Sequence, residues 1–402
     1  MPLLYDLHMA TAFPTESLIG CLVAATLAAL FGLLLRACGV RRAWIFSGVC
    51  IGSLLGVQGL GRFHSAWYEQ FFMGAGSQHR EVFIAERSLE LAESTALVHR
   101  ATVDPSDQAV LEAEIHAANN RLHQARAAFD LPAEWLVACM AACAVIGCSP
   151  LIGRNIWWSH GGLAIGVWSV AASASAVAIT LSMTENPSNQ AWWLVAISFV
   201  CLGAPPMRAR DHWLAVRLLG SPAATLDGAR GTAGMISLLL VLLVAVSRGG
   251  DHPAWLLPWG ALVAAWGLVG MPPQSFLRWT GPAIAACVAI AMSRLDPISD
   301  WKPLVAFGFF LAAEDMRWLG ASAGLAIWGR CPWRASVRST MPLADASSAQ
   351  AALAAAAGMS GVIPAWMVWS LLASAATVAL FEPLRRTTAL RLDQSNRPSP
   401  GT

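Results

Sequence analysis

Three charged residues stand close together in an otherwise apolar stretch of the sequence. Glu314, Asp315 and Arg317 lie near the middle of the block 303–329. Residues three positions apart lie on one face of a helix, so Glu314 and Arg317 can meet there as an ion pair. A carboxylate held at the depth of a bilayer can bind a proton or a cation, with the arginine as an internal counter-charge.

The block 303–329 also allows a simpler interpretation. The same charges can mark a polar break between two shorter helices, and they then have no role in binding. We favour the polar break and keep the buried ion site as the alternative. The number of helices in this block decides between the two, because a single span forces Glu314 and Asp315 to face protein, Arg317 or water.

The composition of the whole chain places these residues in a membrane protein. Charged residues make up 12% of the 402 residues and hydrophobic residues 56%, against roughly 25% and 45–50% in soluble domains. A soluble fold of this composition would lack the polar surface that it needs, whereas lipid accepts apolar side chains on the outside of the fold. We therefore predict an all-α, polytopic transmembrane helical bundle.

The apolar residues occur in blocks long enough to cross a bilayer, and we expect roughly eleven spans. The blocks are 18–35, 43–60, 133–151, 161–183, 191–205, 231–247, 254–270, 279–293, 303–329, 347–361 and 362–381. Many Trp residues lie at block ends, as expected of an aromatic belt at the membrane surface. Gly52 and Gly56 have the spacing that is typical of closely packed helices.

The distribution of arginine predicts the orientation in the membrane. Arg36, Arg41 and Arg42 follow the first block, whereas the first sixteen residues contain no Lys or Arg. Cytoplasmic loops carry the excess of positive charge, so we expect the N-terminus outside and the C-terminus in the cytoplasm of a multi-pass protein of the cell inner membrane.

A long polar insertion separates the second and third blocks. Apolar residues recur every three or four positions in two runs: Val82, Ala85, Leu89, Ala92 and Ala96, then Leu111, Ile115, Ala118, Leu122, Ala125 and Phe129. Between them, Asp104 and Pro105 have the types expected at a helix start. We predict an extramembrane helical hairpin, in which the two apolar stripes pack on each other. An arm that binds a partner is the alternative.

These features divide the chain into four parts. We expect the first two transmembrane helices in 1–73, the extracytoplasmic hairpin in 74–132, the transmembrane bundle in 133–385 and a disordered cytoplasmic tail in 386–402.

Two regions resemble the monovalent cation:proton antiporter family, which includes the sodium/proton exchangers and potassium-efflux systems. The stretch 41–72 contains Arg41-Arg42, a glycine-rich helix that ends in Gly59-Leu-Gly61-Arg62, and Trp67-Tyr-Glu-Gln-Phe-Phe72. It is similar to the second span of the family, with Val57 in place of the usual proline. The stretches 307–310 and 361–383 are similar to two late segments. These stretches comprise 59 of the 402 residues, and the resemblance implies exchange of a monovalent cation for protons.

The ion site implied by the resemblance departs from the family at its centre. The family places a pair of acidic residues, or Asn and Asp, on one helix. Thr232 and Ala233 occupy the best-matching positions of this sequence. Neither side chain titrates, so the site is degenerate and exchange by the family's mechanism is in doubt. Glu314, Asp315 and Arg317 are then the remaining candidates for ion binding.

Other classes of function find little support in the sequence. The sequence contains no Walker-type phosphate loop, HExxH or GxSxG motif and no paired CxxC cysteines, so we expect no enzyme, metal site or cofactor. A net charge of +2 does not indicate nucleic acid. The expected partners are the lipid bilayer, a monovalent cation and a proton, and a homodimer stays open. The alternative to transport is a transport-inactive relative that acts as a membrane scaffold or sensor through its external hairpin.

Overall fold

The computed structural model describes the chain in several separate stretches. These are residues 15–40, 43–72, 105–127, 131–148, 274–295, 302–328, 330, 332–340, 348–360, 363 and 365–394, with shorter pieces within 85–96, 167–175 and 256–261. Nearly all of these residues are helical, and none of them is in a strand. The predicted all-α class is confirmed for this part of the chain.

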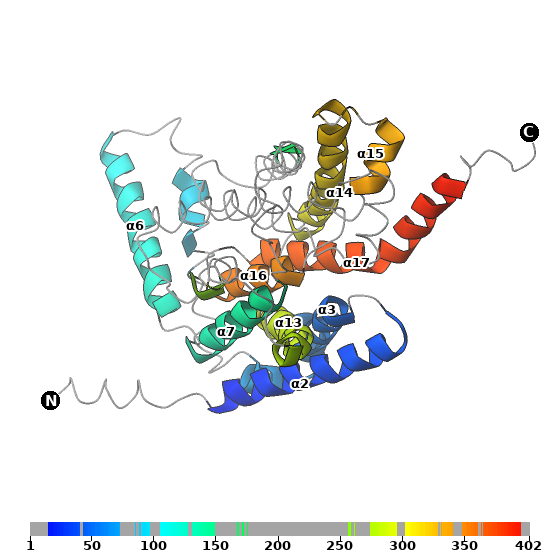
Figure 1. The fold of residues 1–402 in the computed structure, drawn as a ribbon. Coiled ribbons are helices and arrows are strands. Elements are labelled where there is room, and N and C mark those ends of the chain that lie inside the picture. Colours follow the sequence, from blue (N-terminus) through cyan, green and yellow to red (C-terminus); the bar gives the residue numbers. More distant parts are fainter. Residues whose placement is uncertain are drawn as a thin grey trace, which may run out of the picture.

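Four of the described helices pack around α13. The bounds of the described helices are α2 Thr15–Ala37, α3 Ala43–Leu55, the π-helix η1 Val57–Gly61, α4 Ser65–Phe71, α6 Pro105–Ala127, α7 Leu131–Cys148, α13 Gln274–Arg294, α14 Lys302–Trp328, α15 Trp333–Thr340, α16 Ser348–Met359 and α17 Ala365–Gln394. Helix α13 packs against α2, α3, α7 and α16, and α14 packs against α15 and α17. Helices α16 and α17 thus lie between the α13 group and α14 (Figure 1).

Small residues allow the helices of this bundle to approach closely. A Cβ atom built on Gly52 would lie 2.5 Å from Cβ of Met292 and 2.9 Å from the carbonyl oxygen of Ala289, both on α13. A Cβ atom on Gly56 would lie 3.0 Å from the carbonyl oxygen of Met292. The close packing predicted from the spacing of Gly52 and Gly56 is therefore confirmed.

The second predicted span, 43–60, is not one regular helix. Helix α3 ends at Leu55, and the chain continues at Val57 as the π-helix η1. The amide N–H of Gly61 donates to the carbonyl oxygen of Gly56 over 3.1 Å, which widens the helix by one residue. Glycine is needed here, because a Cβ atom on Gly59 would lie 2.0 Å from the carbonyl oxygen of Leu54. The glycines of this segment therefore serve the turn as well as the packing.

Two of the described helical segments are long and apolar enough to cross a membrane, Ser17–Ala37 and Ala43–Gly61. Length and composition alone are weak support, because a buried helix of a soluble protein can share them. The outer face of α2 adds a second observation, since a row of large apolar side chains is exposed there: Ile19, Leu22, Val23, Leu27, Leu30, Leu33 and Leu34. A continuous face of this kind is unfavourable in water and suits contact with lipid.

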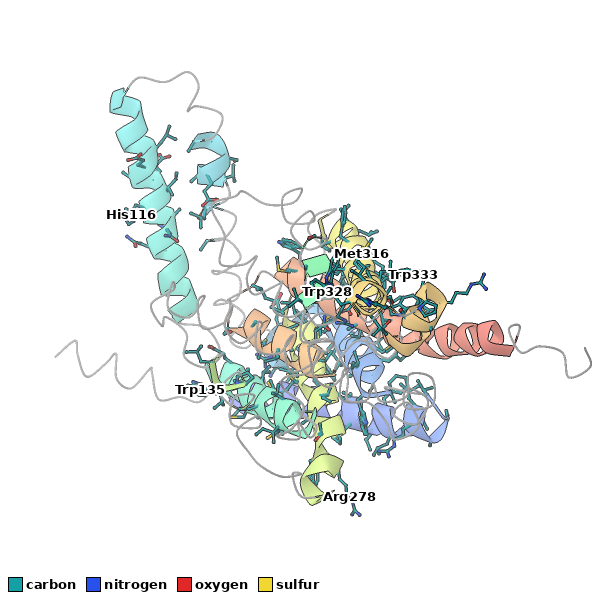
Figure 2. The ribbon with its side chains drawn as sticks, turned by 45° about the horizontal axis from the view of Figure 1, so that its top comes forward. His116, Trp135, Arg278, Met316, Trp328 and Trp333 are labelled. Carbon is teal, nitrogen blue, oxygen red and sulfur yellow. The ribbon has the colours of Figure 1, made fainter. Side chains whose placement is uncertain are left out.

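Exposed tryptophans lie near helix ends in the described residues. Trp135 lies in the first turns of α7, Trp279 near the start of α13, Trp328 at the end of α14 and Trp333 at the start of α15. Figure 2 labels Trp328 and Trp333, which lie on α14 and α15, two helices that pack against each other. The aromatic belt at the membrane surface stays a prediction.

In the described part of the polar insertion, residues of the predicted apolar stripes are buried or half-buried. Helix α6 begins at Pro105, as predicted. Ala118 is buried and Leu111 and Ile115 are half-buried, whereas His116 is exposed. In the first run Ala85 is buried. Figures 1 and 2 show a short helical piece from this run beside α6, away from the rest of the bundle. The location of this hairpin outside the membrane stays a prediction.

The paired stripes lead to a test by proteolysis. Leu111→Asp places a charge in the half-buried stripe of α6 and should open the hairpin, so that limited proteolysis cuts within 81–129 several times faster. His116→Asp is the matched control, because His116 lies on the exposed face of the same helix. Equal cleavage of both variants would contradict the packing of the stripes.

Two predictions from the C-terminal region are wrong. Helix α17 continues to Gln394, so the first part of the predicted disordered tail 386–402 is helical. Helix α14 runs without a break from Lys302 to Trp328, so the favoured polar break within 303–329 is absent. Most of the predicted spans 161–183, 191–205, 231–247 and 254–270 lie outside the described residues, and the total of eleven spans stays a prediction.

Candidate functional site

One continuous helix carries the charged residues that the sequence singles out. Helix α14 has 27 residues, and a rise of 1.5 Å per residue gives it a length of about 40 Å, more than a bilayer's hydrocarbon core. Good helix formers surround Glu314 and Arg317, and charges three residues apart satisfy each other on the helix surface. The local sequence therefore keeps the helix intact across its polar centre.

Glu314 and Arg317 form a buried ion pair. Nη2 of Arg317 lies 2.6 Å from Oε2 of Glu314, and the two side chains are only 2% and 1% exposed. The contact confirms the prediction that these residues meet on one helical face. Burial of an isolated carboxylate costs several kcal/mol or more, so Arg317 is the group that makes an ionised Glu314 tolerable here.

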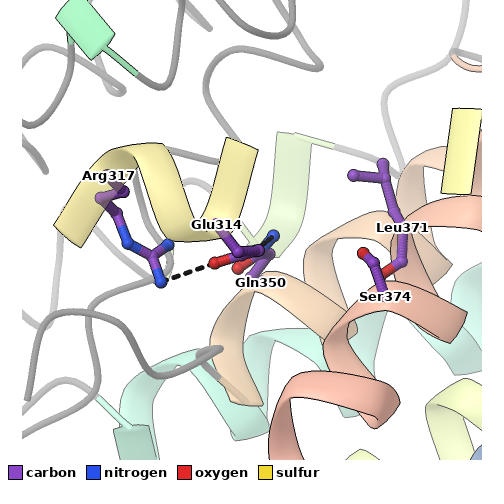
Figure 3. Close-up of polar contacts among 5 residues, drawn as sticks. All are labelled: Glu314, Arg317, Gln350, Leu371 and Ser374. Carbon is purple, nitrogen blue, oxygen red and sulfur yellow. Dashed lines mark hydrogen bonds and ion pairs between the residues drawn. The ribbon is translucent and has the colours of Figure 1, made fainter. Parts of the chain in front are cut away.

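Gln350 is the third member of the cluster and comes from another helix. Its Nε2 donates a hydrogen bond of 2.7 Å to Oε1 of Glu314 (Figure 3). Gln350 lies in the first turn of α16, which begins at Ser348. The N-terminal end of a helix carries a partial positive charge, so the position of α16 also favours a negative Glu314. We call Glu314, Arg317 and Gln350 the α14–α16 cluster.

Two oxygens of the α14–α16 cluster have no hydrogen bond, and only that of Glu314 is in an ion pair. Gln350 is 1% exposed, and its Oε1 accepts no hydrogen bond within the structure described. Oε2 of Glu314 contacts Arg317 as an ion pair and makes no separate hydrogen bond there. Figure 3 shows Ser374 of α17 across from Gln350, and the hydroxyl of Ser374 donates within its own helix to Leu371. The cluster thus combines a carboxylate with a buried amide oxygen that can still accept.

The other predicted site residues do not join the cluster. Asp315 is half-buried and lies next to Glu314 in the chain, so a helix turns it away from the Glu314–Arg317 face. Thr232 and Ala233, the positions of the degenerate family site, lie outside the described residues. Of the predicted ion-binding residues, the structure therefore brings together Glu314 and Arg317.

A second group of polar contacts joins α2 and α4 to the end of α13. Nη2 of Arg294 donates to the carbonyl oxygen of Ser17 over 3.0 Å and to its hydroxyl over 2.8 Å. The hydroxyl of Tyr68 donates to the carbonyl oxygen of Ser293 over 2.9 Å. Arg294 is the last residue of α13, where a positive side chain compensates the negative helix end. These bonds satisfy a helix terminus, which is a structural role.

A metal centre finds no support in the described residues. They contain no group of three or more His, Cys, Asp and Glu side chains that could hold a metal ion. Their cysteines are free thiols, of which Cys21 and Cys287 are buried. Buried thiols of this kind serve as small packing residues.

Comparison with protein-family models, with curated proteins and with solved structures gave no match. The described residues define an all-helical fold with an exposed apolar row on α2 and a buried ion pair between Glu314 and Arg317. The resemblance to cation:proton antiporters stays a prediction from the sequence.

Proposed function

We propose that this chain is a multi-pass membrane protein that exchanges a monovalent cation for protons. The observation that carries this proposal is the buried carboxylate of Glu314 within a helix long enough to cross the bilayer. An ionisable residue within a membrane span costs free energy, so a Glu314 that lies in such a span is a candidate for an ion or proton pathway. The sequence resemblance to antiporters supports the same class of transport.

Glu314 is the group that binds either ligand in turn. A carboxylate can take a proton or coordinate a cation, and exchange requires that both ligands compete for it. Arg317 neutralises Glu314 when neither ligand is bound, because its guanidinium lies 2.6 Å from Oε2. Arg317 therefore prevents an isolated negative charge in the empty site.

The lipid-facing surface supports the membrane part of the proposal. The exposed apolar row on α2 and the exposed tryptophans at helix ends match the two zones of a bilayer, its hydrocarbon core and its surfaces. The closely packed glycines between α3 and α13 fit helix association within lipid, where small residues replace the hydrophobic driving force.

A second candidate function is a transport-inactive membrane scaffold or sensor. It is favoured by the pairing of Glu314, whose Oε1 accepts from Gln350 and whose Oε2 contacts Arg317. The non-titrating Thr232 and Ala233 at the positions of the family site favour it as well. In this case the α14–α16 cluster only holds α14 and α16 together, and the polar hairpin is the functional part.

Flux measurements on the parent protein distinguish the two functions. The purified protein is reconstituted into vesicles with a pH-sensitive dye inside, a pH gradient is imposed, and lithium, sodium or potassium is added outside. The proposal predicts that at least one of these cations dissipates the gradient, whereas choline does not. No response to any of the three cations would reject transport in favour of the inactive relative.

A further inference from the structure

We propose that Gln350 is a ligand of the monovalent cation at Glu314 and determines which cation the site prefers. This inference rests on the proposed function, because it adds a residue to the same site. It extends that function by assigning the second cation-coordinating oxygen to a helix distant in sequence from α14.

The first observation is that the buried amide of Gln350 has an oxygen that accepts no hydrogen bond. Nε2 of Gln350 donates to Glu314 over 2.7 Å, whereas Oε1 of the same side chain accepts no hydrogen bond within the described structure. A buried carbonyl oxygen without a partner costs about 1–3 kcal/mol. The site as it stands therefore has an acceptor that a bound ligand can satisfy.

The second observation is the place of this oxygen. Oε1 and Nε2 of Gln350 belong to one planar amide, so Oε1 is in the same small group that holds the carboxylate of Glu314 through Nε2. Carboxylate and amide oxygens are preferred by hard cations, and Glu314 with Gln350 supplies one of each. The remaining member of the cluster, Arg317, has only donors and cannot coordinate a cation.

The approach of a cation rearranges the contacts of Glu314. A cation and a guanidinium compete for the same carboxylate, so the cation replaces Arg317 at Oε2. Oε1 of Gln350 then adds a second protein oxygen to the coordination, from helix α16. Because α14 and α16 hold the two residues on separate rigid elements, the reach of the Gln350 side chain sets the size of the site.

Gln350 can be tested by thermal unfolding of the purified full-length protein in detergent, which measures binding without transport. A cation that binds the folded state raises the melting temperature as its concentration increases. We compare the parent with Gln350→Met, which keeps the length and removes the oxygen, and with Gln350→Asn, which shortens the reach. Glu314→Gln is the positive control and Asp315→Asn the negative control. Lithium, sodium and potassium are titrated against choline at constant ionic strength.

The expected result is stabilisation of the parent by at least one of the three cations. Gln350→Met should need a cation concentration higher by about tenfold or more for the same shift, equivalent to the loss of one ligand. Gln350→Asn should fold as the parent does and change the order of preference toward the larger cation. If Gln350→Met alone proves too unstable to titrate, the changed preference of Gln350→Asn decides the matter.

Three results would overturn the inference. A response lost in Glu314→Gln and unchanged in both Gln350 variants rejects Gln350 and leaves the proposed function intact. A response unchanged in all variants rejects the whole cluster as the site. A parent that no cation stabilises rejects cation coordination by Gln350, and the vesicle flux of the parent then decides the proposed function separately.

Discussion

Replacement of Arg317 by Met is expected to destabilise the protein by about 3–5 kcal/mol, the cost of leaving a buried charge without its counter-charge. Glu314 is 1% exposed and its Oε2 lies 2.6 Å from Arg317. Methionine fills much of the same volume and cannot neutralise the carboxylate. The measurement is thermal unfolding of the purified variant in detergent, followed by circular dichroism.

The double variant Glu314→Gln with Arg317→Met provides the internal control. It removes both charges, so it should recover most of the stability that either single change loses. Arg334→Met is a matched surface control, because Arg334 is exposed on α15 and its loss should change stability by no more than about 0.5 kcal/mol. Equal stability of Arg317→Met and the parent would show that Glu314 does not depend on this ion pair.

Replacement of Gly52 by Ala should lower stability by about 1–3 kcal/mol, because the added methyl group overpacks the contact between α3 and α13. The built Cβ atom lies 2.5 Å from Cβ of Met292 and 2.9 Å from the backbone oxygen of Ala289. A backbone oxygen cannot move aside as a flexible side chain can, so the helices themselves must separate.

Gly308 offers the matched control for Gly52. A Cβ atom built on Gly308 meets nothing within 4 Å, although this residue also lies within a helix. Gly308→Ala should therefore be neutral or stabilise the protein by up to about 1 kcal/mol through helix propensity. Similar effects of the two substitutions on the melting temperature would contradict the close packing of α3 on α13.

The sequence predicts the individual helices better than their interruptions. Apolar block length alone predicts α2, α7 and α13, because a span is a local property of about 20 residues. The break at Gly56 is harder to predict, since it depends on the contact of the glycines with α13 as well as on their backbone freedom. The predicted break in α14 is wrong, because the sequence does not show that Gln350 of another helix also contacts Glu314 inside the bundle.

The α14–α16 cluster could be predicted only in part. The pair of Glu314 and Arg317 follows from helical spacing within one element. Gln350 is 36 positions away from Glu314, and no local pattern connects the two. The available signal was the single amide side chain in the alanine-rich block 347–361, because a polar residue in such a block needs a partner.

The central claim is that Glu314 carries the exchanged ion. The most direct test measures vesicle flux in two variants, each of which lacks one of the neighbouring carboxylates Glu314 and Asp315. Glu314→Gln should lower proton-coupled cation flux by about tenfold or more, whereas Asp315→Asn should stay within about twofold of the parent. Both variants lose one carboxylate from the same turn of α14, and only Glu314 belongs to the buried cluster. Flux that persists in Glu314→Gln, at equal amounts of reconstituted protein, would contradict the account.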